Sequence, residues 1–112
     1  MVKPKTRNYS PLARDAAALL GEMIHSARIG RKMTAVELAE RAGVSRGLVS
    51  RVENGDMGAS IGAAFEMAAV LGVPLFDVDP GRVSRGLEQL RTVNALLPKR
   101  AFQSTAEVDD DF

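Results

Sequence analysis

The stretch that decides the fold is residues 34–54, TAVELAERAGVSRGLVSRVEN. Thr34 can cap a first helix, and Glu37 three residues later completes a capping box. Gly43 stands where a helix end needs a left-handed residue, a conformation that glycine adopts without a Cβ clash. Ser45 can cap a second helix. The stretch therefore predicts two short helices joined by a tight turn.

The side chains of these two helices divide into an apolar and a polar face. Those predicted to face inward are Leu38, Ala39, Ala42, Val49 and Val52, with Val44 just before the second cap. Those predicted to face outward from the second helix are Arg46, Gly47, Ser50 and Arg51. The outward residues are small or cationic and include no acid.

This pattern resembles the helix-turn-helix of the Cro/C1-type repressors, the XRE-like regulators of bacteria. The matching positions are Leu38, Ala39, Gly43, Val44, Val49, Val52 and the closing Glu53-Asn54-Gly55. The resemblance covers residues 21 to 78 and implies an all-α fold, a five-helix Cro/C1-type (lambda-repressor-like) DNA-binding domain. Relatives commonly carry a glutamine in place of Ala35 and a basic residue in place of Asp56. Both departures weaken the predicted grip on the DNA backbone.

The resemblance also pairs Arg28, on the preceding helix, with Glu53. We interpret this pair as a structural tie between the two helices rather than as a DNA contact, because losing one partner of a partly buried pair costs several kcal/mol. His25 is interpreted as an ordinary residue of the helix surface.

Composition excludes several other classes of protein. The chain has 112 residues, 4% aromatic residues, no cysteine and one histidine, His25. A disulfide, a zinc site or a histidine-based catalytic triad therefore cannot form within one chain, and no cofactor, metal or enzymatic activity is expected. The apolar run that ends at Leu20 is too short for a signal peptide or membrane span. We expect a soluble, cytoplasmic protein that does not contact a membrane.

Charge is distributed unevenly. Residues 1–53 carry ten Lys/Arg and five Asp/Glu, a net charge of +5, whereas residues 54–112 carry five and nine, a net charge of −4. The helix-turn-helix therefore lies in the basic half, as binding to phosphates requires.

The chain before the motif divides into an arm and a helix. Residues 1–9 predict a disordered basic arm, either a solubilising tail or a segment that touches phosphates. Ser10-Pro11 then predicts a helix to about Lys32 that begins residues 10–78, the DNA-binding domain. Its predicted inward face is Leu12, Ala16, Leu19, Leu20, Met23, Ile24 and Ala27. Gly21 is expected to bend or break this helix.

After the motif, Ser60 predicts the cap of a further helix that ends at Gly72. Its predicted inward face is Ile61, Ala64, Phe65, Ala68 and Leu71. Leu75-Phe76 is expected to lie in the short fifth helix of the related domains.

Residues 79–97, opened by Asp79-Pro80, predict an additional C-terminal helix with a heptad-like seam. The seam is Val83, Leu87, Leu90, Asn94 and Leu97. It can pack either on its own domain or on a second copy of the chain. Asparagine in such a seam can fix register, which favours a homodimer.

The tail, residues 98–112, reads PKRAFQSTAEVDDDF and predicts disorder. It is similar to the ending of the HipB-like antitoxins, which accompany HipA-type kinase toxins. The resemblance implies that Asp109, Asp110, Asp111 and Phe112 bind such a partner, although an acidic tail can also simply aid solubility.

Together these features predict a sequence-specific double-stranded DNA-binding repressor that acts as a homodimer on a palindromic operator. The helix after Ser45 would enter the major groove, where arginine reads guanine. The predicted DNA contacts are Arg31, Lys32, Thr34, Ser45, Arg46, Gly47, Ser50, Arg51 and Asn54. Two alternatives remain: a module that neutralises a toxin through its tail, and a regulator without a toxin.

Overall fold

The computed structural model describes residues 8–98. The basic arm up to Arg7 and the predicted partner-binding residues Asp109, Asp110, Asp111 and Phe112 lie outside these described residues. The chain divides into two compact units, Met1–Pro80 and Gly81–Phe112.

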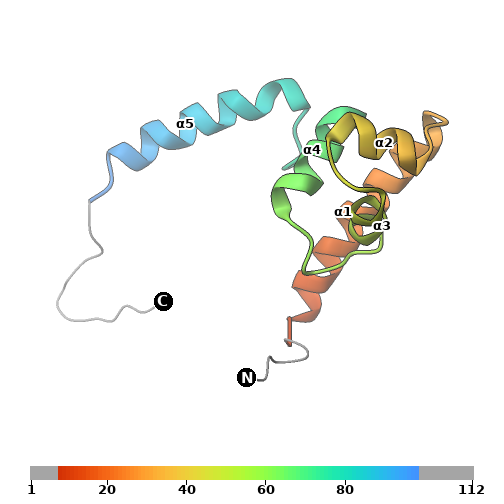
Figure 1. Cartoon of the computed structure of the whole chain (residues 1–112). Coiled ribbons are helices and arrows are strands. Elements are labelled where there is room, and N and C mark those ends of the chain that lie inside the picture. Colours follow the sequence, from red (N-terminus) through yellow and green to blue (C-terminus); the bar gives the residue numbers. More distant parts are fainter. Residues whose placement is uncertain (1–7, 99–112) are drawn as a thin grey trace. The chain divides into compact units, whose positions relative to one another are not determined.

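The first unit contains four helices, α1 (Pro11–Gly30), α2 (Ala35–Ala42), α3 (Arg46–Glu53) and α4 (Ile61–Leu71) (Figure 1). A short 3-10 turn at Pro80–Arg82 leads into α5 (Val83–Ala95) of the second unit. The described residues form no strand and only one isolated bridge, between Leu75 and Val78. The predicted all-α fold class is therefore confirmed.

Helices α1 to α4 begin where the sequence places their caps. The side-chain oxygens of Ser10, Thr34, Ser45 and Ser60 each accept a backbone N–H bond of 3.0–3.1 Å from the residue three positions later. Each such cap typically contributes about 1 kcal/mol. Thr34 and Glu37 also form the predicted capping box, since the Thr34 N–H donates to Oε1 of Glu37 over 2.8 Å.

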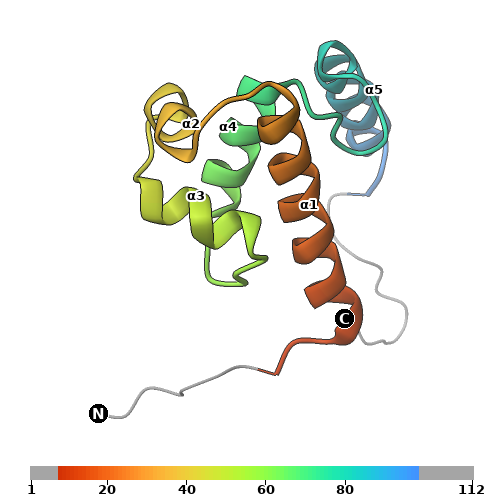
Figure 2. The same cartoon turned by 90° about the vertical axis from the view of Figure 1, so that its right-hand side faces the viewer.

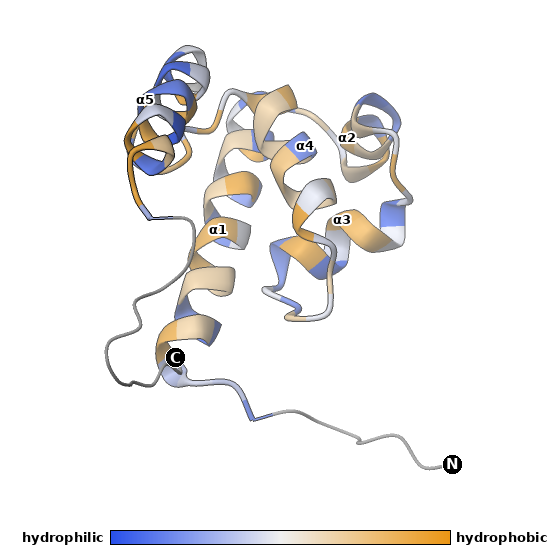
Figure 3. Ribbon diagram, turned by 90° about the vertical axis from the view of Figure 1, so that its left-hand side faces the viewer, coloured by the Kyte–Doolittle hydropathy of each residue, from blue (hydrophilic) through white to orange (hydrophobic). Residues whose placement is uncertain are grey.

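The core forms around α4, which contacts each of the other three helices of its unit. In Figure 2, α4 lies between α1 on one side and α2 and α3 on the other. Figure 3 shows hydrophobic residues along most of α4. The buried side chains are Ile24, Met33, Leu38, Ala39, Ala42, Val49, Val52, Ala64, Met67, Ala68, Leu71 and Val73.

Helix α1 is continuous, so the predicted break at Gly21 is wrong. Gly21 is buried because the C-terminal end of α3 approaches it closely. A Cβ atom at this position would lie 2.7 Å from the carbonyl oxygen of Glu53 and would also clash with that of Val52. The glycine therefore serves close helix packing.

The predicted inward face of α1 is correct only in the second half of the helix. Leu12 and Leu19 are 78% and 62% exposed, and Ala16 is exposed as well, so their predicted burial is wrong. The other predicted inward residues, Leu20, Met23, Ile24 and Ala27, are buried or half-buried. Towards the start of the helix, Ala13 and Ala17 continue this side.

Two further predictions fail around α4. Ile61, its first residue, is 69% exposed, whereas Met67 is fully buried and was not predicted. The expected short helix at Leu75-Phe76 is a tight turn, in which Phe76 and Asp77 have φ values of 55° and 64°. The ring of Phe76 meets that of Phe65 edge-on at 6.0 Å, a favourable contact.

The additional helix is present but shorter than predicted. Asp79 does not cap it, because α5 begins at Val83 after Arg82, without a side-chain cap bond. Leu97 lies beyond its end, so the seam on the helix runs from Val83 to Asn94. No residue of α5 is buried, and Leu87 and Leu90 are 47% and 59% exposed.

No helix among residues 8–98 is long and apolar enough to cross a membrane.

Candidate nucleic-acid interface

The turn between α2 and α3 sets the orientation of α3. Gly43 has a φ of 71° and donates its N–H to the end of α2, and the Val44 N–H bonds the Ala39 carbonyl over 3.0 Å. The buried Ala39 side chain lets the two helices approach. These residues behave as the sequence predicts.

Helix α3 presents the predicted polar face. Val49 and Val52 are buried, whereas the predicted outward residues are exposed, namely Ser45, Arg46, Gly47, Ser50, Arg51 and Asn54. A Cβ atom at Gly47 would meet only the Ser45 side chain, at 4.0 Å, so this part of the helix is open to an approaching partner.

The one acid of α3 is turned inward. Glu53 accepts bonds from Arg28 Nε at 2.6 Å and Arg28 Nη2 at 3.0 Å, and its Oε1 lies 2.9 Å from Nδ1 of His25. The Arg28 and Glu53 side chains are only 12% and 10% exposed. Arg28 Nη1 also donates to the Met33 carbonyl at 3.0 Å. The predicted pair is present, and His25 joins it.

The pKa values of this cluster follow from its geometry. Burial tends to raise the pKa of Glu53, but the hydrogen bonds and positive charges of Arg28 and His25 outweigh burial and lower it below its ordinary value. The bond and charge of Glu53 raise the pKa of Arg28 against the opposing effect of burial. Glu53 is therefore ionised, and its carboxylate is bonded to Arg28 and His25. The outward face of α3 is left cationic.

The predicted hydroxyl contacts are positioned by capping. Thr34 and Ser45 accept backbone N–H bonds as caps, and Ser50 receives a long bond, 3.5 Å, from Asn54 Nδ2. A hydroxyl that accepts still has its own proton to donate. These groups can therefore donate to phosphate or base acceptors.

The predicted cations differ in their surroundings. Within residues 8–98, Arg46 has no side-chain hydrogen bond or ion pair. Lys32 is exposed and has a φ of 56°, in the α1–α2 connection. The guanidinium of Arg31 lies beside Gly72, where a Cβ atom would be 3.2 Å from Nη2. Arg31 thus lies at the C-terminal end of α4, where a cation is favourable to the helix dipole.

Arg51 has an acidic partner that the sequence analysis missed. Its Nε donates to Oδ2 of Asp56 over 2.7 Å, outside the helix in the following loop. The available signal was the glycine at position 55. After a left-handed glycine the next residue returns toward the last turn of the helix.

Ala35 lines a polar hollow of about 300 Å³. The hollow is also lined by Ser50, Asn54 and the His25–Glu53 pair. The start of α2 and the exposed end of α3 therefore adjoin one another on one surface. The short Ala35 side chain cannot fill the hollow.

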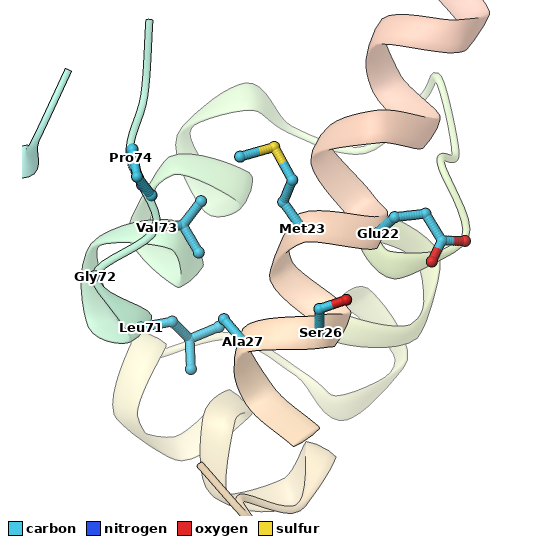
Figure 4. A pocket seen from close by; sticks show the side chains of 8 residues that line it. All are labelled: Glu22, Met23, Ser26, Ala27, Leu71, Gly72, Val73 and Pro74. Carbon is cyan, nitrogen blue, oxygen red and sulfur yellow. The ribbon is translucent and has the colours of Figure 1, made fainter. Parts of the chain in front are cut away.

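A second, open groove of about 490 Å³ lies between the middle of α1 and the residues that follow α4 (Figure 4). Met23, Ala27, Leu71 and Val73 make its lining mostly apolar. The lining holds no pairing of a nucleophile with a base. Among the described residues, no group of three or more His, Asp or Glu side chains is placed to hold a metal ion.

Comparisons with known proteins match this geometry. The family model for the helix-turn-helix matches residues 24–78. No curated protein matches the chain. The crystal structure of the clp gene regulator ClgR from Corynebacterium glutamicum is similar, with 28% sequence identity and a TM-score of 0.50 over 79% of this chain and 94% of that one.

The matched region extends from Ile24, in the middle of α1, to Val78, just after α4, and so contains all of α2 and α3. The family match and the similar regulator support the interpretation of this chain as a DNA-binding transcriptional regulator. Residues 24–78 are thus a helix-turn-helix domain of the Cro/C1 (XRE) type.

Proposed function

We propose that this chain is a sequence-specific repressor that binds double-stranded DNA as a homodimer, with α3 in the major groove. The observation that carries the proposal is the composition of the exposed face of α3. This face displays two arginines, two serines and a glycine, while the only acid of the helix is paired within the protein.

Base reading is assigned to the exposed face of α3, whose N-terminal half lies nearest the bases in helix-turn-helix proteins. Arg46 is the strongest candidate because it is exposed and has no ion-pair partner among the described residues. A guanidinium can donate two parallel bonds to O6 and N7 of guanine. Gly47 beside it lets the helix approach the bases closely.

Backbone contacts are assigned to residues around the start of α2 and the end of α3. Thr34, at the cap of α2, and Asn54, after α3, flank the hollow lined by Ala35. Lys32 precedes Thr34 by two residues and supplies a cation. Such contacts orient a domain on the duplex without reading its sequence. Arg31 is the weakest candidate because its guanidinium lies beside Gly72.

Substituting Arg46 by alanine should cost about 1–3 kcal/mol on the preferred site, or roughly 5- to 150-fold in affinity, and should relax preference at one base pair. The matched control is Lys32→Ala, which should weaken all sequences alike and lower the salt slope of log K by roughly one. Anisotropy titrations against a duplex selected from a random pool, its single-base variants and random DNA measure both effects. Equal, sequence-independent losses for the two variants would contradict the role of Arg46.

The homodimer is assigned to α5. Its seam residues Leu87, Leu90 and Asn94 recur at heptad-like spacing on the helix. An apolar seam with one polar position is typical of helices that pair. Two copies would also match the two half-sites of a palindromic operator.

Placing a charge in this seam should produce a monomer. Leu90→Glu puts a carboxylate where two seams would meet, and burying an unpaired charge is strongly unfavourable. Gln89→Glu adds the same charge one residue away, off the seam, and should leave the dimer intact. Sedimentation velocity distinguishes the two masses. A Leu90→Glu protein that still sediments as a dimer would refute this assignment.

The antitoxin role stays a prediction from the sequence of residues 98–112. Its four partner-binding residues, Asp109 to Phe112, lie outside the described part of the chain. DNA binding through α3 does not depend on this role.

A further inference from the structure

Helix α3 ends in a way that brings a loop residue back to its side. Gly55 has a φ of 75°, its N–H bonds the Val52 carbonyl over 3.0 Å, and the Asp56 N–H bonds the Arg51 carbonyl over 2.9 Å. This pair of hydrogen bonds is the Schellman motif, which places the residue after the glycine beside the third residue from the helix end. That contact is commonly apolar. Here it joins Asp56 to Arg51.

The carboxylate of Asp56 is fixed before it meets the arginine. Its Oδ1 accepts the Gly58 N–H at 2.8 Å, and its own carbonyl accepts the Ala59 N–H at 3.1 Å. The preceding Gly55 rests on α1, since a Cβ atom there would be 3.0 Å from Cα of Ala18. The backbone therefore sets where Oδ2 lies, and the longer side chain of Arg51 is held against it.

The pair engages only one nitrogen of the guanidinium. Nε of Arg51 donates to Oδ2 of Asp56 at 2.7 Å, while Nη1 and Nη2 have no hydrogen-bond partner among residues 8–98. These two terminal nitrogens form the end of a planar fork that matches the two acceptors of guanine. Fixing Nε thus restricts the orientation of this fork, on a side chain that is 53% exposed.

Arg46 offers an internal comparison. It projects from the same exposed face, but no carboxylate is paired with it in the described structure. Arg51 is therefore the arginine of α3 whose guanidinium already has a carboxylate partner before any ligand arrives. An ordered arginine loses less side-chain entropy on binding than a free one.

We propose that Asp56 is a positioning residue for DNA recognition, which holds Arg51 with its Nη edge presented to one base and thereby sets specificity at that base pair. This inference rests on the proposed function. It also reverses the expectation from sequence, in which an acid at this position only weakens the grip on DNA.

The rival effect of Asp56 is plain repulsion of phosphates. Its side chain is 38% exposed in a basic region, so Coulomb repulsion alone predicts that neutralising it improves binding to every duplex. Positioning predicts a different result, a selective loss at one base pair. The two effects therefore separate when affinity for random DNA and discrimination between bases are measured independently.

The test is a double-mutant cycle with Asp56→Asn and Arg51→Ala in the full chain. Titrations use the selected duplex, its full set of single-base variants and random-sequence DNA. Arg51→Ala should lose base discrimination at one base pair. Asp56→Asn should reduce discrimination at that same base pair about fivefold or more. Its affinity for random DNA should be unchanged or higher. In the Arg51→Ala background, Asp56→Asn should change discrimination no further.

Glu40→Gln is the control for charge alone, because it removes the negative charge of an exposed residue on α2. It should leave discrimination between bases intact. Thermal unfolding of each variant controls for a general loss of structure. The role of Asp56 is overturned if Asp56→Asn changes operator and random DNA by the same factor, or if its effect persists without Arg51. A wild-type chain with no base preference overturns the proposed function first, and this inference with it.

Discussion

Replacing Glu53 by alanine is expected to destabilise the domain by about 3–5 kcal/mol, the largest effect of any substitution considered for this chain. The reason is that Arg28, whose side chain is only 12% exposed in the folded protein, would lose its carboxylate partner. Its bond to the Met33 carbonyl cannot compensate a whole charge. The loss should also release the C-terminal end of α3 from α1.

Urea unfolding followed by circular dichroism measures this effect. Glu66→Ala is the matched control, because Glu66 is an exposed glutamate within α4 without an ion pair in the described structure, and it should change stability by less than about 0.5 kcal/mol. The combined variant Arg28→Met, Glu53→Leu should recover much of the loss, since apolar replacement of a buried pair is often neutral. Equal effects of Glu53→Ala and Glu66→Ala would show that the pair contributes nothing.

The same pair predicts a pH dependence. The pKa of Glu53 is lowered from its ordinary value of 4.5 in the folded protein. The unfolded chain therefore takes up this proton first as pH falls, so the stabilisation is complete above pH 4.5 and is lost as pH falls through the folded pKa. The stability difference between wild type and Glu53→Gln should accordingly shrink in that range.

Replacing Gly21 by alanine should destabilise the domain by about 3 kcal/mol, at the upper end of the range for overpacking. The added Cβ meets backbone carbonyl oxygens of α3 at 2.7 Å or less, and backbone cannot move aside as the tip of a side chain can. The gain in helix propensity, at most about 1 kcal/mol, does not offset the clash.

Gly30→Ala is the control for propensity. Gly30 is the last residue of α1 and has nothing within 4 Å of an added Cβ. This variant should be neutral or slightly more stable, by up to roughly 1 kcal/mol. Thermal unfolding of both proteins decides the matter. A Gly21→Ala protein as stable as Gly30→Ala would mean that α1 and α3 do not pack as closely as described.

The helix caps and Gly21 show what the sequence could and could not predict about the fold. Caps such as Thr34 and Ser45 were predicted correctly because each is recognised by residues within one turn. The role of Gly21 depends on α3, about thirty residues away along the chain. Periodicity alone could not supply that contact. It also could not show that the first turns of α1, with Leu12 and Leu19, are exposed.

The prediction of a short helix after α4 was wrong for a related reason. Leu75-Phe76 has the apolar character of a short helix, but the ring of Phe76 finds Phe65 on α4. This contact joins residues eleven positions apart, and local sequence alone could not predict it.

In the candidate site, the exposure of Arg46, Gly47 and Ser50 followed from helical spacing and was predictable. The pairing of Arg51 with Asp56 was not predicted, because it depends on the return of the chain after Gly55. The position of Arg31 beside Gly72 depends on the packing of α1 against α4. Spacing thus predicted which α3 side chains point outward but not which charges were already paired.

The central claim is that the exposed face of α3 reads DNA sequence. The most direct test exposes the purified chain to a pool of random duplexes at moderate ionic strength, and then measures binding of the enriched duplex against random competitor. The account predicts an enriched site with two related half-sites, bound more tightly than random DNA by about 10³-fold or more. Recovery of a pool that is bound no better than random DNA would contradict it.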